Sequence, residues 1–112
     1  NPLPAMRDAI AARDFTEVGE LSEASALAMH AVMISCNLLY WNAATVALLH
    51  AVAEFRRGGR ECYATIDAGP QVKVLCQPSD LSTLAGKLQD VPGVLRVLQA
   101  APGPDARVES TP

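Results

Sequence analysis

The chain has 112 residues and half of them are hydrophobic, which suits one domain with its own core. The formal net charge is −3, aromatic residues make up 4% and no basic run occurs, so nucleic acid is not expected as a partner. The longest apolar stretches, 24–34 and 43–53, are about half the ~20 residues that a membrane-spanning helix needs. We therefore expect no membrane segment.

The first residue and the cysteines indicate whether the chain is part of a longer polypeptide and in which redox compartment it lies. Asn1 is not an initiator Met and no signal-peptide pattern follows it, so we expect a part of a longer polypeptide. Cys36, Cys62 and Cys76 lie far apart and have no metal-ligand spacing. We interpret them as thiols without a chemical role in a reducing, cytoplasmic compartment, with a disulfide between Cys62 and Cys76 as the alternative.

The first elements in chain order are two predicted helices. Pro2 and Pro4 are expected to open a short helix over 5–12, because proline is tolerated in a first helical turn. Asp14 then precedes a long helical pattern over 15–35 and is expected to be its N-cap. The apolar stripe predicted for this helix consists of Phe15, Val18, Leu21, Ser25, Leu27, Ala31 and Ile34.

A break separates these helices from a third one. Segment 37–41 is predicted to be a loop whose apolar side chains turn inward, and 38–41 could instead form an additional strand. Asn42 is expected to cap a helix over 43–57, which the glycine pair 58–59 ends.

The apolar period changes to two after the third helix, which is typical of strands. The runs 61–66 and 71–77 predict a hairpin joined across 67–70. Alternation along the first run predicts two faces, one with Cys62, Ala64 and Ile66 and the other with Tyr63, Thr65 and Asp67.

The last predicted elements are a helix over 80–89, capped by Ser79, and a strand over 94–99. Residues 101–112 are rich in proline, glycine and charge, so we predict a disordered tail after a domain at 1–100. The order of elements predicts an α+β fold in which helices pack on one face of a small antiparallel sheet, with a ferredoxin-like arrangement at its end.

The candidate site is the turn 67–70, which reads Asp-Ala-Gly-Pro. Asp67 at a strand end is interpreted as a general base or orienting carboxylate in a cleft beside Tyr63 and Thr65, or as an ordinary turn aspartate. Gly69 either allows a positive φ or lets a phosphate group approach the backbone.

Other polar side chains have weaker cases. Lys73 could balance Asp67, bind an anion or be an exposed lysine without a role. His30, among apolar helical residues, is expected to be buried with one hydrogen bond rather than catalytic, and His50 has a weaker case still. No metal-ligand motif and no nucleophile with its base is seen in the sequence.

Five segments of the chain form an ordered set of motifs. The strongest, 64–73, reads Ala-Thr-Ile-Asp-Ala-Gly-Pro-Gln-Val-Lys. The others are Ala12-Arg13-Asp14-Phe15 with Gly19-Glu20, Met29-His30-Ala31, Tyr40-Trp41-Asn42 and Pro92-Gly93-Val94. Over 5–100 these segments resemble, in the correct order, the signatures of the diphosphomevalonate decarboxylases of the GHMP kinase superfamily.

The resemblance implies a reaction and residues that take part in it. The family uses ATP and magnesium to phosphorylate the tertiary hydroxyl of mevalonate 5-diphosphate, and loss of phosphate and carbon dioxide then gives isopentenyl diphosphate. The family's catalytic aspartate corresponds to Asp67, which takes up or orients the hydroxyl proton. Ala68, Gly69 and Gln71 are implied substrate contacts, although many members have Asn where this chain has Gln71.

The resemblance also implies that the chain is a C-terminal domain. The family's phosphate-binding loop, substrate-binding arginine and phosphate-binding serine all precede the region to which this chain corresponds. We therefore expect ATP and Mg²⁺ to bind mainly to an N-terminal GHMP domain of the same polypeptide, and the fragment alone to be inactive. The family is often dimeric, so a homodimer is included among the expected partners.

Two other functions are considered. A superfamily kinase could phosphorylate mevalonate or its phosphates without decarboxylation, but such kinases tend to lack an acid at the position of Asp67. A non-enzymatic α+β module for binding or dimerisation is the second alternative.

Overall fold

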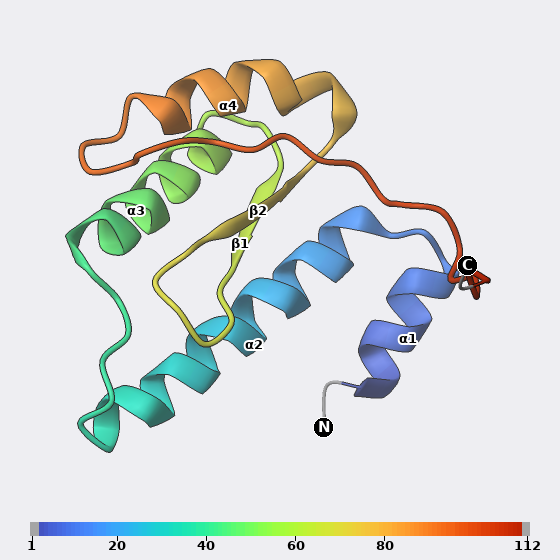
Figure 1. Ribbon diagram of the computed structural model, residues 1–112, viewed down its shortest axis with the longest axis horizontal. Coiled ribbons are helices and arrows are strands. Elements are labelled where there is room, and N and C mark those ends of the chain that lie inside the picture. Colours follow the sequence, from blue (N-terminus) through green and yellow to red (C-terminus); the bar gives the residue numbers. More distant parts are fainter. Residues whose placement is uncertain (1–2, 111–112) are drawn as a thin grey trace.

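The computed structural model describes residues 3–110, so the role predicted for Pro2 and the end of the tail lie outside the described residues. The elements are α1 (Leu3–Ala11), α2 (Phe15–Ser35), α3 (Ala43–Arg57), β1 (Cys62–Thr65), β2 (Lys73–Cys76), the 3₁₀ turn η1 (Pro78–Asp80) and α4 (Leu81–Gln89). Figure 1 shows the β1–β2 hairpin between α2 on one side and α3 with α4 on the other. The α+β class predicted from the sequence is confirmed.

Two of the predicted helix caps form as expected. The Asp14 carboxylate accepts the Glu17 N–H at 3.1 Å at the start of α2. At the start of α3, Asn42 Oδ1 accepts the Thr45 N–H at 2.9 Å, and Thr45 Oγ1 accepts the Asn42 N–H at 3.2 Å. This reciprocal pair satisfies two backbone donors that a helix start would otherwise leave free.

The cap predicted at Ser79 is wrong. Pro78 begins the 3₁₀ turn η1, and Asp80 occupies the N-cap position of α4, where its side chain does not accept a hydrogen bond from the helix start. Proline has a fixed φ suited to a first helical turn, which favours a helical start at Pro78 rather than after Ser79.

The hairpin has the predicted antiparallel pairing, although both strands are shorter than expected. Cys62 lies opposite Cys76, and Thr65 lies opposite Lys73. The main core cluster joins β1 to the third and fourth helices, and its buried members are Val52, Phe55, Cys62, Ala64, Leu84 and Leu88.

Cys36, Cys62 and Cys76 are free thiols, and burial raises the pKa of the Cys62 thiol to about 11.

The edge of β1 that does not face β2 is satisfied by side chains. Glu23 on α2 accepts the Ala64 N–H at 3.0 Å, and Arg56 on α3 donates to the Cys62 carbonyl at 2.8 Å. Glu23 and Arg56 also form an ion pair with an O–N distance of 2.9 Å. The expectation of helices on one face therefore describes α3 and α4, whereas α2 runs along this edge.

The stripe predicted for the second half of α2 is wrong. Leu27, Ala31 and Ile34 are exposed, and the buried residues of α2 are Gly19, Ala26 and His30. Both sets have helical spacing, so periodicity alone does not decide which set faces the domain. The close approach of α2 to β1 favours small residues on the buried side.

Two other local predictions are also wrong. No strand forms at 94–99, where Gln89 Oε1 accepts the Val97 N–H at 3.1 Å and only Val94 and Val97 are half-buried. In 37–41, Leu38, Leu39 and Tyr40 are exposed rather than turned inward, and this part contains neither helix nor strand. Residues 101–110 have no helix or strand and are exposed, and their disorder stays a prediction.

A test of the packing between α2 and β1 uses two helical glycines. A Cβ at Gly19 would overlap the Tyr63 ring, so we expect Gly19→Ala to lower the free energy of unfolding by about 1–3 kcal/mol. A Cβ at Gly86 in α4 would meet nothing within 4 Å, so Gly86→Ala should raise stability by about 0.5–1 kcal/mol. Urea unfolding measures both, and a neutral or stabilising Gly19→Ala would contradict this packing.

Candidate functional site

Asp67 lies two residues after the end of β1, next to the buried Ile66, and its own side chain points outward. The carboxylate is 80% exposed and forms an ion pair with Lys73 of β2, with an Oδ2–Nζ distance of 2.7 Å. The hydrogen bond and charge of Lys73 lower the pKa of the Asp67 carboxyl below its ordinary value. Asp67 is therefore ionised at neutral pH. Lys73 balances its charge, which was one of the three alternatives considered for this lysine from the sequence.

A shallow hollow of about 280 Å³ adjoins this carboxylate. It lies between α1, α2 and the end of β1, and its lining residues are Met6, Ser22, Ser25, Ala26, Met29, Thr65, Ile66 and Asp67. Thr65 is thus a neighbour of Asp67, as expected. The serine hydroxyls and Met6 were missed by sequence reasoning, because nothing in their local pattern links them to the turn.

Tyr63 is not a neighbour of this hollow, which corrects the sequence prediction. Its ring is buried against Gly19 and makes an edge contact with Phe15 at 5.9 Å between centroids. Its hydroxyl donates to Glu61 Oε1 at 3.0 Å. The side of β1 that was expected to be open is covered by α2 at this point.

Two side chains from different helices hold the backbone of the turn. His30 Nε2 on α2 lies 2.7 Å from the Asp67 carbonyl oxygen, and Thr45 Oγ1 on α3 donates to the Pro70 carbonyl at 2.7 Å. The prediction that His30 is buried with one hydrogen bond is confirmed. Thr45 was not singled out from the sequence, although its position three residues after the Asn42 cap was visible there.

The other predicted site residues lie on the same turn. Ala68 and Gln71 are exposed, and Gly69 is half-buried. Gly69 does not have a positive φ, so that explanation for a glycine here is wrong. A Cβ at Gly69 would meet the Gln71 amide oxygen, so the glycine makes room for this side chain.

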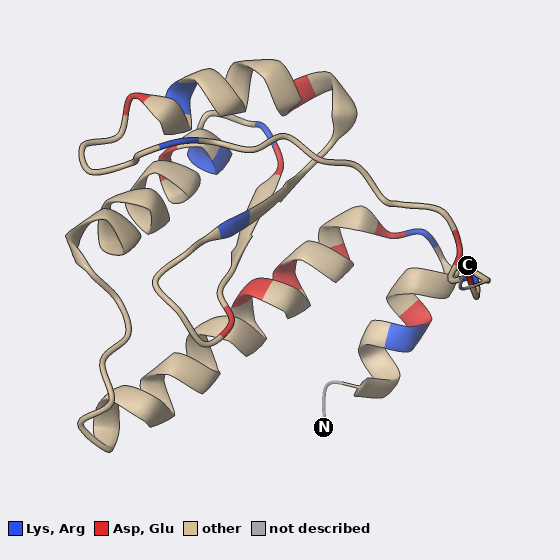
Figure 2. Cartoon of the chain, in the orientation of Figure 1, with Lys and Arg blue, Asp and Glu red and all other residues tan. Residues whose placement is uncertain are grey.

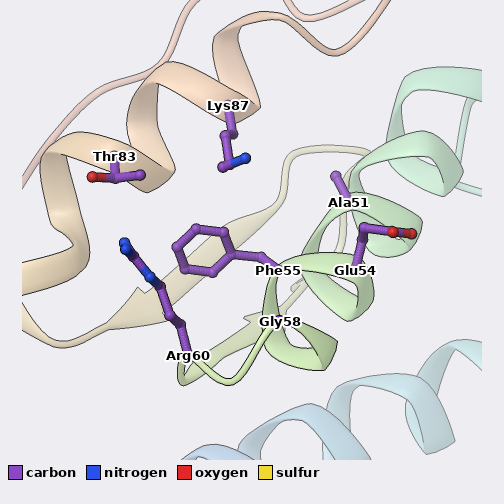
Figure 3. A pocket seen from close by; sticks show the side chains of 7 residues that line it. All are labelled: Ala51, Glu54, Phe55, Gly58, Arg60, Thr83 and Lys87. Carbon is purple, nitrogen blue, oxygen red and sulfur yellow. The ribbon is translucent and has the colours of Figure 1, made fainter.

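A larger hollow, of about 450 Å³, lies elsewhere between α3 and α4 (Figure 3). Arg60 lies over the Phe55 ring at 5.6 Å and forms an ion pair with Asp80 at 3.4 Å. Glu54 also lines this hollow, opposite in charge to Arg60 and Lys87. None of the residues that the sequence analysis singled out as site candidates lines this hollow.

Among residues 3–110, no group of three or more His, Cys, Asp or Glu side chains has a geometry suited to a metal ion. Within the same residues, no helix is both long enough and apolar enough to cross a membrane.

A comparison with protein families identifies the domain. The family model described as the mevalonate 5-diphosphate decarboxylase C-terminal domain matches residues 1–101. The chain belongs to this family. The matched range includes the turn 67–70 and both helices that hold it.

Solved structures of decarboxylases are similar to this domain. The mevalonate pyrophosphate decarboxylase of Streptococcus pyogenes is 42% identical, with a TM-score of 0.71 over 77% of this chain and 28% of its own. The mevalonate diphosphate decarboxylase of Enterococcus faecalis is 34% identical, with a TM-score of 0.72 over 79% of this chain and 28% of its own. The Staphylococcus aureus enzyme is 33% identical, with a TM-score of 0.73 over 77% of this chain and 27% of its own.

The decarboxylase domain therefore spans less than a third of the length of these chains. A search of curated proteins gave no match.

A test of the site's electrostatics replaces the lysine of the ion pair. Because the Lys73 ammonium stabilises the carboxylate form, Lys73→Gln should raise the pKa of Asp67 back towards the ordinary value of about 3.9. The lowered pKa of Asp67 stabilises the fold at pH values above the ordinary pKa of the carboxyl, and this effect is lost as pH falls. Because solvent screens the exposed ion pair, little change in the free energy of unfolding is expected.

NMR titration of the Asp67 carboxyl carbon measures this shift. Lys87→Gln is the matched control, since Lys87 lines the other hollow and should leave the titration unchanged. Superimposable curves for the native protein and Lys73→Gln would show that the ion pair does not exist in solution.

Proposed function

We propose that this chain is the C-terminal domain of an ATP-dependent decarboxylase that converts mevalonate 5-diphosphate to isopentenyl diphosphate. The tertiary hydroxyl is phosphorylated first, and phosphate and carbon dioxide are then lost. The observation that carries this proposal is the family match over residues 1–101, which contains the Asp67 turn. A kinase that does not decarboxylate and a non-enzymatic module are less favoured, because the matched family is that of the decarboxylases.

Asp67 is proposed as the catalytic carboxylate. It is exposed at the rim of a hollow and ionised at neutral pH, so it can accept a hydrogen bond from a substrate hydroxyl. A lowered pKa makes it a weak base. This suits phosphoryl transfer with a loose transition state, in which orienting the hydroxyl matters more than removing its proton early.

Neighbouring groups would assist this carboxylate. Lys73 lies 2.7 Å from Asp67 and could turn to an anionic substrate group, because its side chain is largely exposed. Ala68, Gly69 and Gln71 are proposed as substrate contacts, through the turn backbone and the Gln71 amide.

ATP and Mg²⁺ are proposed to bind mainly outside this domain. Among the described residues that line its hollow, Asp67 is the only acid, and it already has a cation partner, so this set does not suit a magnesium site. One similar solved structure is a complex with MVAPP, AMPPCP and magnesium, and the domain covers 28% of that chain. Bound ATP would supply the phosphoryl group, and this domain would supply the carboxylate facing it. We therefore expect the domain to be inactive alone.

An N-terminal domain of the same polypeptide is proposed as the partner. Residues 24–53 contain no Asp, Glu, Lys or Arg, and Figure 2 shows this uncharged run from the second half of α2 to α3. Large apolar side chains are exposed along its first part: Leu27, Met29, Val32, Ile34, Leu38, Leu39 and Tyr40. We refer to these seven residues, which lie on two sides of α2 and on the loop that follows it, as the apolar surface. Such a surface is typical of one that another domain covers. A homodimer and a cytoplasmic location remain predictions.

The decisive experiment is Asp67→Asn in the full-length protein. Loss of the carboxylate should lower turnover by about 10³-fold while substrate affinity is mostly kept, because a carboxylate that orients the reacting hydroxyl and takes up its proton during phosphoryl transfer contributes about 10²–10⁴-fold. Release of carbon dioxide, ADP and isopentenyl diphosphate is measured with ATP and mevalonate 5-diphosphate.

Asp105→Asn in the exposed C-terminal segment is the matched control and should keep full turnover. Near-normal turnover of Asp67→Asn would remove this residue from the mechanism. A stable phosphorylated product without carbon dioxide release from the native protein would favour the kinase.

A further inference from the structure

The buried polar side chains of this domain gather at one place. Apart from the Tyr63 hydroxyl and the Cys62 thiol, the buried polar side chains among residues 3–110 are those of His30 and Thr45, each 1% exposed. Burying such a group is costly unless it is hydrogen-bonded. Both side chains form a hydrogen bond with a backbone carbonyl of the same four-residue turn. His30 bonds the carbonyl of its first residue, Asp67, and Thr45 bonds that of its last residue, Pro70.

We propose that His30 and Thr45 are positioning residues that fix both ends of the turn 67–70 and thereby aim the Asp67 carboxylate. The proposal rests on the function proposed above for Asp67. Neither residue is proposed to touch the substrate.

The geometry at His30 supports a fixed contact. A carbonyl oxygen can only accept, so the proton of the 2.7 Å hydrogen bond is on His30 Nε2. The Trp41 ring packs against the His30 ring with 5.1 Å between centroids, which restricts rotation of the imidazole. The Asp67 carbonyl is therefore tied to the middle of α2.

The geometry at Thr45 is equally restricted. Its hydroxyl oxygen accepts the Asn42 N–H and donates to the Pro70 carbonyl, so one side chain joins the start of α3 to the turn. Because Thr45 also belongs to the capping pair with Asn42, its rotamer is set by the helix start. The Pro70 carbonyl is therefore tied to a rigid element.

These two ties matter because the Asp67 side chain has little support of its own. Its carboxylate is largely exposed, and among the described residues its hydrogen-bond partner is the Lys73 side chain, which is also largely exposed. The direction of the carboxylate therefore depends on the backbone to which it is attached. A displacement of a catalytic group by about 1 Å can lower a rate by about 10²-fold.

The test uses isosteric substitutions in the full-length protein. Thr45→Val keeps the shape and removes the hydroxyl, and His30→Phe keeps a ring against Trp41 and removes the donor. Each should lower kcat by about 10- to 100-fold with little change in KM. Thr45→Ser keeps the hydroxyl and should retain most of the turnover. Thr83→Val on the exposed side of α4 is the matched control and should be neutral.

A double-mutant cycle separates positioning from a general structural role. When Asp67 is already Asn, adding Thr45→Val should lower the residual turnover by no more than about 2-fold, because residues that act through one group are not additive. A structural defect would lower both backgrounds by the same factor, and that result would overturn the proposal. Normal kcat in both Thr45→Val and His30→Phe would also overturn it.

The same variants distinguish failure of the catalytic role proposed for Asp67 from failure of the positioning role proposed for His30 and Thr45. If Asp67→Asn loses turnover but Thr45→Val and His30→Phe do not, the function proposed for Asp67 stands and the positioning role fails. If Asp67→Asn keeps near-normal turnover, both fail.

Discussion

The edge of β1 that faces away from β2 is the constraint on which the rest of the domain depends. A strand with one partner has unpaired N–H and C=O groups along its other edge, and in a buried position these need other partners. Glu23 and Arg56 supply them at Ala64 and Cys62, which draws α2 against the strand. Gly19 permits that approach, and His30, further along the same buried face of α2, then reaches the carbonyl of Asp67. The site is thus a consequence of how the strand edge is satisfied.

Local chemistry made much of the fold predictable. Asp14 and Asn42 cap helices because their side chains bond the backbone three residues on, and such contacts are visible in sequence. The hairpin followed from a period of two. The errors concern long-range choices: which of two helical faces of α2 is buried, and whether 94–99 finds a strand partner. Gln89 takes the Val97 N–H instead, which no local pattern could indicate.

In the candidate site, too, features set by local sequence could be predicted, and features set by long-range contacts could not. Asp67 was recognisable because its neighbours 64–73 form a motif, whereas its pairing with Lys73 was one of three alternatives that the sequence left open. The burial of His30 with one hydrogen bond was predicted, but the partners of His30 and Thr45 were hidden because both are backbone carbonyls, 37 and 25 residues away, and a carbonyl carries no sequence signature. Tyr63 was misplaced because strand alternation gives the side of the strand but not the helix that covers it.

The apolar surface defined above has a consequence for how the protein is made. If the proposed N-terminal domain precedes this one, it leaves the ribosome first and is available when α2 is synthesised. The apolar surface would then meet a folded template at once. A chain released without that template would instead carry these side chains into water, where they would promote aggregation. Solubility at high concentration is therefore a property that this domain would owe to its neighbour.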